Sequence, residues 1–398
     1  MLKRLLFLFG LVGTVLYCSA QNESFPSDRP DSNILSGAYH FEQYLPALQG
    51  KKVALMVNQT AEVNGVLLPD TLLRLGVKVV KIFSPEHGFR GKADAGAVVQ
   101  NGLDAETGLP VISLYGNHKK PTAAELKDVD IMIYDLQDVG VRFYTYISSL
   151  EYLMEACAAE GIPLMILDRP NPLGFVVDGP VLDRKYSSFV GMQPVPVLYG
   201  MTPGEYATML IGEKWIAPSN IELIVIKCSG YNHSSLYELP VSPSPNLKSM
   251  TAIYLYPSLC FFEGTPISVG RGTALPFQQF GHPLLKNYTY RFTPKSMPGS
   301  SDPLLKGQTC YGLLVADNAA DALKLIDGKL QLGWLMEAYK NYPEQEKFFT
   351  TFFEKLAGTD VLRKQIIQGL SEKEIRASWK PALEQFLRIR SKYLLYAE

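Results

Sequence analysis

The sequence lacks the short motifs that mark the commonest enzyme families. It contains no GxGxxG fingerprint for dinucleotides, no P-loop, no HExxH zinc motif and no GxSxG nucleophile turn. Because each of these motifs builds the site for its chemistry, their absence argues against a dehydrogenase, an NTPase, a zincin and an α/β-hydrolase. The five cysteines form no CxxC pair, so buried free thiols are expected rather than a disulfide framework.

Charge is balanced and spread along the chain. There are 38 Lys and Arg residues against 39 Asp and Glu residues, which gives a net charge of −1. No basic block stands out, so neither nucleic acid nor an anionic membrane is an expected partner. The 398 residues, 47% of them hydrophobic, exceed what one core usually holds and favour a globular protein of two domains.

The longest apolar run lies at the N-terminus and is typical of a secretion signal. Two basic residues precede the run Leu5–Tyr17, which is too short to span a bilayer comfortably, and small residues follow up to Ala20. Residues 1–20 are therefore expected to be a signal peptide cleaved after Ala20, and the mature protein to be periplasmic or secreted. Acylation of Cys18 is the alternative, which the bulky residue before it disfavours. No later stretch is long and apolar enough to predict a membrane span.

Alternating strand and helix patterns predict an α/β fold with a Rossmann-like parallel sheet. Four apolar runs are typical of strands buried on both faces: Val53–Val57, Val77–Phe83, Ile131–Tyr134 and Ile162–Leu167. Helical patterns lie between them, the fullest at Tyr146–Glu160, and Ile221–Ile226 is a further strand candidate. Capping boxes at Thr202 and Ser371 predict the starts of two more helices.

The predicted organisation is a disordered lead at 21–35, a Rossmann-like catalytic domain at 36–230 and a second domain at 231–398. The second domain is expected to be a smaller α+β unit that covers the cleft and ends in helices. Residues 231–310 are rich in Pro, Tyr and Ser, so irregular structure and short strands are expected there. Pro381 is expected to interrupt or kink the last helix.

A polar loop follows each of the four predicted strands. The loop residues are Asn58 after the first strand, Glu86 and His87 after the second, Asp135, Gln137 and Asp138 after the third, and Asp168, Arg169 and Asn171 after the fourth. The carboxyl ends of parallel strands share one edge of the sheet, and ligands bind in the crevice there. The four loops together therefore predict a binding or catalytic site.

Glu86 is the leading candidate for acid catalysis. It lies on a turn between a proline and a glycine, where partial burial would raise its pKa and suit it to donate a proton. The alternative is a loop carboxylate that caps a helix or pairs with Arg90.

The other loops allow more than one interpretation. Asp135 and Asp138 fit a metal pair, an acid/base pair or partners of Arg142. Tyr144 offers an aromatic surface that suits stacking on a sugar and equally suits a core. For the loop at 168–172, the alternative to ligand binding is a rigid turn with a local salt bridge.

The irregular middle region adds three candidates. Glu263 is the best second carboxylate by type and place. Arg271 lies between two glycines, which let the backbone approach a ligand and free the guanidinium to grip an anion. A tight turn with a solvated arginine is the alternative, and Asn246 is a weaker candidate.

Several longer motifs together resemble one known family. They are SPEHGFRG, YDLQDVGVRFYTY, LDRPNPLG, SPNL, FFEGTPISVGRGT and IRASWKPALEQF, and the likeness covers roughly residues 36–398. The family, formerly a domain of unknown function, is that of exo-acting β-N-acetylmuramidases of peptidoglycan turnover. The resemblance implies a Rossmann-like domain joined to a smaller one, with the site between them. It also implies release of N-acetylmuramic acid from non-reducing ends of peptidoglycan-derived glycans, with Glu86 as the catalytic acid.

The sequence leaves the mechanism open among three routes. Two carboxylates can act with retention or with inversion, or the substrate's acetamido oxygen can attack while a residue such as Asp135 or Asp138 orients it. Muramic acid also carries a lactyl carboxylate, which Arg271 or Arg142 could bind in a bidentate fork. No metal or other cofactor is expected.

Two other functions remain as alternatives. One is a metal-dependent amidase or phosphoesterase of the cell wall, for which Glu86, His87, Asp135, Asp138 and Asp168 are plausible ligand types. The other is a periplasmic sugar-binding protein without turnover.

Overall fold

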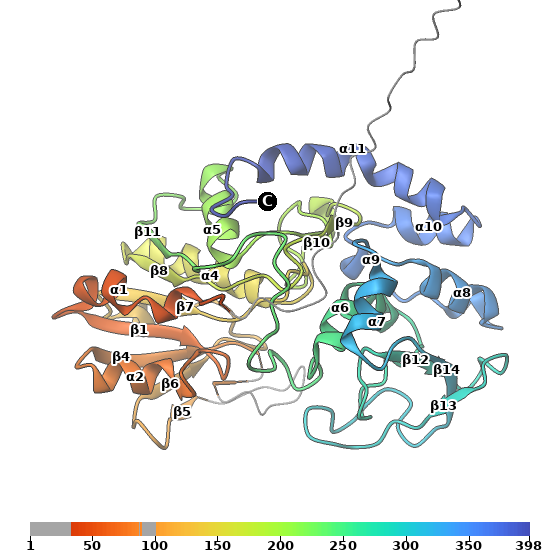
Figure 1. Cartoon of the computed structure of the whole chain (residues 1–398), viewed down its shortest axis with the longest axis horizontal. Coiled ribbons are helices and arrows are strands. Elements are labelled where there is room, and N and C mark those ends of the chain that lie inside the picture. Colours follow the sequence, from red (N-terminus) through yellow and green to blue (C-terminus); the bar gives the residue numbers. More distant parts are fainter. Residues whose placement is uncertain (1–32, 87, 90–100) are drawn as a thin grey trace, which may run out of the picture.

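The computed structural model of the protein describes residues 33–86, 88–89 and 101–398. The predicted signal peptide and most of the predicted disordered lead lie outside these residues. The described chain forms a larger sheet-containing part and a smaller part that follows it, with the last long helix running along the top of both (Figure 1).

The larger part is built on a seven-stranded sheet of order β11-β8-β7-β1-β4-β6-β5. Its strands are β1 (Lys52–Val57), β4 (Lys78–Ser84), β5 (Gly102–Leu103), β6 (Pro110–Ser113), β7 (Ile131–Asp135), β8 (Leu164–Leu167) and β11 (Leu223–Ile226). All neighbours pair in parallel except β5, which runs antiparallel to β6 at one edge. The predicted parallel sheet and its four predicted strands are confirmed.

Helices cover both faces of this sheet. They are α1 (Phe41–Leu48) and α2 (Leu68–Arg74) on one face, with α4 (Tyr146–Glu160) and α5 (Pro203–Gly212) on the other. Successive side chains of β1 alternate between the two cores: Val53 and Leu55 pack with the first pair of helices, and Ala54 and Met56 with the second. Burial on both faces explains why these strands are continuous apolar runs in the sequence.

The chain order creates a crevice near the middle of the sheet. From β1 the chain builds β4 and β6 on one side, and it then crosses back to place β7 on the other side of β1. Ligand sites in open α/β sheets form outside the strand ends at such a switch point. The loops after β1, β4 and β7 meet there.

Short elements complete the larger part. They are α3 (Ala123–Leu126), the pair β2 (Glu62–Val63) and β3 (Val66–Leu67), the pair β9 (Val177–Asp178) and β10 (Leu198–Tyr199), and the 3₁₀ turns η1 (Gly37–Tyr39) and η2 (Arg184–Tyr186). The capping box predicted at Thr202 is present at the start of α5.

The smaller part holds a three-stranded antiparallel sheet and six helices among the described residues. The strands are β12 (Gln279–His282), β13 (Tyr290–Phe292) and β14 (Cys310–Leu314), in the order β12-β14-β13. The helices are α6 (Met250–Leu259), α7 (Ala319–Ile326), α8 (Gly333–Asn341), α9 (Thr351–Ala357), α10 (Val361–Ile367) and α11 (Glu372–Arg390), with η3 (Cys260–Gly264) and η4 (Gln345–Lys347) as 3₁₀ turns.

Two predictions for this region need correction. Helix α6 lies where irregular structure was expected. All of its residues are buried, so its sequence shows no amphipathic stripe that would have predicted a helix. Helix α11 continues through Pro381, so the expected interruption is absent, while the expected kink stays a prediction. The capping box predicted at Ser371 is confirmed.

Candidate active site

A pocket of about 400 Å³, a volume that includes space open to solvent, lies at the carboxyl ends of the sheet strands, between the two parts of the chain. Its lining comes from both parts. The lining residues are Glu86, Phe143, Tyr144, Thr145, Tyr146, Ser244, Leu247, Tyr256, Arg271 and Phe277. Five of these ten lie in the region 231–310.

Glu86 is placed at this pocket by the loop after β4 and is half-buried. The hydroxyl of Thr145, the N-cap residue of α4, donates to Oε2 of Glu86 at 3.1 Å. Tyr115, directly beyond the end of β6, hydrogen-bonds to the same carboxylate. Burial and the charge of Glu86 raise the pKa of the Tyr115 hydroxyl, so it stays protonated as a donor. Three strand-end loops thus converge on one carboxylate.

Tyrosines form one wall of the pocket. The hydroxyl of Tyr144 donates to the carbonyl of Pro243 at 2.8 Å, which ties the loop after β7 to the segment before α6. Asn58, beyond the end of β1, donates to the hydroxyl of Tyr146 at 2.8 Å and so supports the wall from behind. The ring of Tyr256 from α6 meets that of Tyr144 edge-on, at 6.2 Å between centroids.

Arg271 brings a positive charge to the pocket that Glu86 also lines. Its Nε donates to Oε1 of Glu263 at 2.6 Å, and its guanidinium carbon lies 4.8 Å from the ring centre of Phe277. The second oxygen of Glu263 accepts from the thiol of Cys260 at 3.4 Å. Burial disfavours the arginine charge, but Glu263 outweighs this and raises the pKa of Arg271. Glu263 therefore contacts Arg271 and is not among the residues that line the pocket.

The two glycines beside Arg271 are required by the backbone conformation and the close packing of this turn. Both Gly270 and Gly272 have φ of +78°, a left-handed conformation that favours glycine. A Cβ at Gly270 would lie 2.6 Å from Gln279, and one at Gly272 would lie 2.4 Å from Pro303. These glycines hold the turn that presents Arg271.

Asp135 and Arg169 form a buried ion pair rather than part of the pocket lining. Nε and Nη2 of Arg169 donate to the two oxygens of Asp135 at 2.5 and 3.0 Å, a bidentate arrangement. Both side chains are almost fully excluded from solvent. The salt bridge of this loop is therefore not the local one considered for residues 168–172, because its acid is the last residue of the neighbouring strand β7.

Asp168 anchors the C-terminal tail. Its carboxylate accepts from the hydroxyls of Tyr396 at 2.6 Å and Thr202 at 2.7 Å, and from the backbone N–H of Gly204 at 2.8 Å. Burial raises its pKa to about 6. The backbone N–H groups of Leu395 and Tyr396 donate to Glu205 beside it. The predicted site residue Asp168 thus helps to hold the tail in place.

Asp138 and Gln137 are also buried. Asp138 accepts from the hydroxyl of Tyr199 and from the N–H of Gly140, and burial raises its pKa to about 6. Gln137 donates through its side chain to the carbonyl of Pro170 at 2.8 Å. Neither residue lines the pocket.

Three further candidates are placed away from the pocket lining. Arg142 is fully buried, and its guanidinium donates to the carbonyls of Pro180, Val195 and Leu356. Burial lowers its pKa to about 9. The side chain of Asn171 donates to Met201 at 3.0 Å, and that of Asn246 donates to Gly299 at 2.8 Å.

His87 and Arg90 lie outside the described residues, so their predicted roles stay predictions. Among the residues that the structure describes, no group of three or more His, Cys, Asp or Glu side chains is arranged to hold a metal. In the same residues, no helix is long and apolar enough to cross a membrane. Four cysteines are free and buried, as expected: Cys157, Cys228, Cys260 and Cys310.

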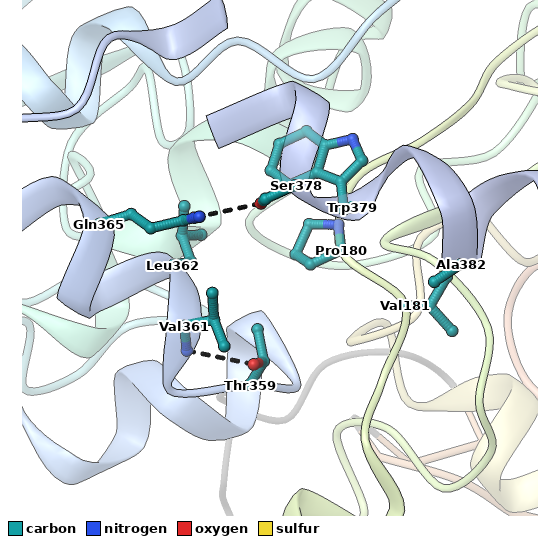
Figure 2. Close-up of a pocket in the computed structure, with 9 residues that line it drawn as sticks. All are labelled: Pro180, Val181, Thr359, Val361, Leu362, Gln365, Ser378, Trp379 and Ala382. Carbon is teal, nitrogen blue, oxygen red and sulfur yellow. Dashed lines mark hydrogen bonds between the residues drawn. The ribbon is translucent and has the colours of Figure 1, made fainter. Parts of the chain in front are cut away.

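A second pocket, of about 470 Å³, lies between α10 and α11 (Figure 2). Its lining is mostly apolar, with Trp379 beside Pro180 and Leu362, and Ser378 donates to Gln365 at 3.3 Å. The described residues that line it include no ionisable side chain. It therefore offers no acid or base for catalysis.

Sequence reasoning missed Tyr115, Thr145 and Tyr256. Tyr115 follows a parallel strand, as the four predicted loops do, but β6 is short and partly exposed and was not recognised. Thr145 and Tyr256 became visible only through partners distant in the sequence.

Family models match almost all of the described chain. The N-terminal model of the exo-β-N-acetylmuramidase NamZ family matches residues 53–251, and its C-terminal model matches residues 254–396. The chain belongs to the NamZ family. The two NamZ segments meet at the start of α6, whereas the sequence alone predicted a domain boundary at 230.

Curated and solved relatives agree with the NamZ assignment. The peptidoglycan β-N-acetylmuramidase NamZ of Bacillus subtilis (strain 168) is 38% identical, over 98% of each chain. Crystal structures of two DUF1343 family proteins from Bacteroides fragilis NCTC 9343 are similar over 92% of this chain and all of theirs. One is 46% identical with a TM-score of 0.85, and the other is 28% identical with a TM-score of 0.75.

Proposed function

We propose that the protein is an exo-acting β-N-acetylmuramidase that releases N-acetylmuramic acid from non-reducing ends of peptidoglycan fragments. The observation that carries the proposal is the strand-end pocket of a NamZ-family chain, in which Glu86 and Arg271 both line the space. This pocket combines an acid, a cation and aromatic surface, which are the groups that a charged amino sugar needs.

Glu86 is the general acid of this proposal. It is half-buried, it lines the pocket, and hydroxyl groups from two other loops hold its carboxylate in place. In the bond-breaking step, its proton passes to the glycosidic oxygen as the C1–O bond breaks. The hydroxyls of Thr145 and Tyr115 then stabilise the carboxylate that remains.

The lining favours the substrate-assisted route. Glu86 is the one carboxylate among the described lining residues, and both oxygens of Glu263 already have protein partners. In this route the acetamido oxygen of the sugar attacks C1 while Glu86 protonates the leaving oxygen. Glu86 then takes a proton from the water that opens the cyclic intermediate. The predicted orienting residues Asp135 and Asp138 do not line the pocket.

The enclosure of the pocket supports action at chain ends. Side chains from the segment 244–277 close one side of the strand-end crevice, so the space suits one terminal sugar rather than an extended strand. A time course on long glycan strands tests this directly. Single sugars should appear from the first time points, and early mid-size fragments would contradict the exo mode.

The reaction itself is tested with a chromogenic β-N-acetylmuramide beside the matching β-N-acetylglucosaminide. The purified protein should release the chromophore from the muramide and much less from the glucosaminide. Activity should persist after dialysis against EDTA. If neither sugar is hydrolysed, the proposed function is wrong, and loss on chelation with recovery on adding Zn²⁺ would favour the metallohydrolase alternative.

Export of the protein is part of the same proposal, because peptidoglycan lies outside the cytoplasm. Its support is the sequence of residues 1–20, with a basic start, the apolar run Leu5–Tyr17 and a small-residue site at Ala20. N-terminal sequencing of the protein from its native host should begin at Gln21. An intact first residue or an acylated Cys18 would contradict this cleavage.

A further inference from the structure

One edge of the Arg271 guanidinium is fixed by the protein, and the other edge is not. Nε donates to Glu263 at 2.6 Å, and Phe277 supports the guanidinium plane. Within residues 33–86, 88–89 and 101–398, no acceptor bonds to Nη1 or Nη2. The side chain keeps 25% of its surface exposed and lines the pocket that Glu86 shares.

The carboxylate of Glu263 is occupied by its neighbours. Oε1 accepts from Arg271, and Oε2 accepts from Cys260, which is buried in η3. A carboxylate held on both oxygens by protein donors and absent from the pocket lining is placed to orient a cation, not to attack a sugar carbon.

We infer that Arg271 binds the lactyl carboxylate of the terminal muramic acid, and that Glu263 is a positioning residue for Arg271. A guanidinium presents two parallel N–H donors along one edge, which match the two oxygens of a carboxylate. Glucosamine carries no carboxylate, so this contact discriminates between the two sugars. The inference rests on the proposed function, because it names which part of that substrate Arg271 recognises.

The way in which Arg271 is held adds to its selectivity. The left-handed glycines on both sides, the Phe277 ring and Glu263 fix the guanidinium before any ligand arrives. A side chain that is already ordered loses less entropy on binding than a free surface arginine. Its positive charge also offsets the repulsion between the lactyl carboxylate and the Glu86 carboxylate that remains once its proton has been transferred.

The first test compares two muramides with the same leaving group, one with a free lactyl carboxylate and one in which that group is a methyl amide. Wild type should prefer the free acid. Arg271→Ala should lower kcat/KM for the acid by about ten- to a hundred-fold, since a hydrogen bond to a charged group contributes about 1.5–3 kcal/mol. The amide should be affected much less, and Arg271→Lys, which keeps the charge without the fork, should be intermediate.

The control is Arg291→Ala, because Arg291 is exposed on β13 and contacts Tyr311. This variant should keep the wild-type preference. Equal losses on the acid and the amide in Arg271→Ala would overturn the role of Arg271. Hydrolysis of neither compound by wild type would instead reject the proposed function.

Calorimetry separates the two conclusions further. Wild type should bind free N-acetylmuramic acid more tightly than N-acetylglucosamine, and Arg271→Ala should lose that difference while its melting temperature is retained. Equal binding of the two sugars by wild type would overturn the inference whether or not hydrolysis occurs.

The second test concerns Glu263. Glu263→Gln keeps a carbonyl oxygen for Nε of Arg271, so kcat should remain within about ten-fold of wild type. The shape of its pH profile should not change. Glu263→Leu removes the acceptor and should lose the acid-over-amide preference as Arg271→Ala does. A fall in kcat of about 10²–10⁴-fold in Glu263→Gln would show proton transfer by Glu263 and overturn its positioning role.

Discussion

Two polar clusters lie at the same edge of the same sheet and differ in where their partners come from. The pocket cluster consists of Glu86, Tyr115, Thr145 and Arg271. The buried cluster consists of Asp135, Asp168, Arg169, Glu205 and Tyr396. In the buried cluster the charged groups are held by other protein groups, whereas the pocket cluster keeps the Nη edge of Arg271 for a ligand.

The comparison shows that residue type and strand-end position do not separate binding from stability. Each cluster has at least one carboxylate at the end of a parallel strand, and each includes an arginine. Arg169 donates through Nε and Nη2 to Asp135, while Arg271 donates through Nε alone within the described residues. The hydrogen-bond partners of the guanidinium group distinguish a structural arginine from one that is available to a ligand.

The largest effect is expected in the pocket cluster. Glu86→Gln removes the proton donor but preserves shape, so kcat should fall by about 10²–10⁴-fold with an unchanged melting temperature. Steady-state kinetics and a thermal melt check the two parts. Glu160→Gln, at the exposed end of α4, is the control and should behave as wild type. Near-normal turnover in Glu86→Gln would remove the main distinction between the clusters.

In the buried cluster the expected loss is in stability. Asp135→Ala leaves the buried Arg169 without its carboxylate, which should cost about 3–5 kcal/mol in the free energy of unfolding. Urea denaturation measures this. The double variant Asp135→Leu with Arg169→Met should recover much of the loss, because an apolar pair needs no charge compensation. If Asp135→Ala were as stable as wild type, the ion pair would contribute nothing to stability.

A pH dependence should come next in size. Burial raises the pKa of Asp138 to about 6, above the value of about 3.9 in an unfolded chain, so the native state binds the proton more tightly. The resulting stabilisation is complete below about pH 4 and is lost as pH rises through about 6, a change of about 3 kcal/mol.

Asp138→Asn does not titrate, so its stability relative to wild type should improve between pH 4 and pH 7. Urea denaturation of both proteins across that range measures the difference. Asp168 titrates in both proteins and cancels in the comparison. A difference that stays constant with pH would contradict the raised pKa.

The smallest effect should come from the tail. Tyr396→Phe removes the hydroxyl that donates to Asp168 and accepts from the N–H of Cys228, at 2.6 and 2.9 Å. The expected cost is about 1–3 kcal/mol, because Asp168 keeps Thr202 and the backbone of Gly204 as donors. Activity per folded molecule should not change. A large loss of kcat at unchanged stability would connect this cluster to catalysis.

The sequence predicted the sheet well because burial on both faces leaves a clear signal. Runs such as Val53–Val57 and Ile131–Tyr134 became β1 and β7 with boundaries that agree within one residue. Helix α6 was missed for the same physical reason, since a helix buried on all sides has no polar face to reveal its period.

The candidate site was predicted less completely. Glu86 and Arg271 were identified from their local glycine-containing turns, which are visible in the sequence. The pairing of Asp135 with Arg169 and the clamp on Asp168 were not visible, because their partners are 34 and 228 residues away. Long-range hydrogen bonds therefore decided which strand-end acids were available to a ligand.

The tail contacts also bear on the order in which a ribosome can complete this fold. Helix α11 carries the chain back along the top of the molecule toward α5 (Figure 1). Tyr396 then reaches Asp168 after β8, and Leu395 reaches Glu205 in α5. During synthesis, the sheet emerges long before these last donors do. Asp168 and Glu205 therefore lack these donors until the chain is made as far as residue 396. If the residues up to α5 fold first, the native hydrogen bonds of these two carboxylates stay incomplete until the tail is made.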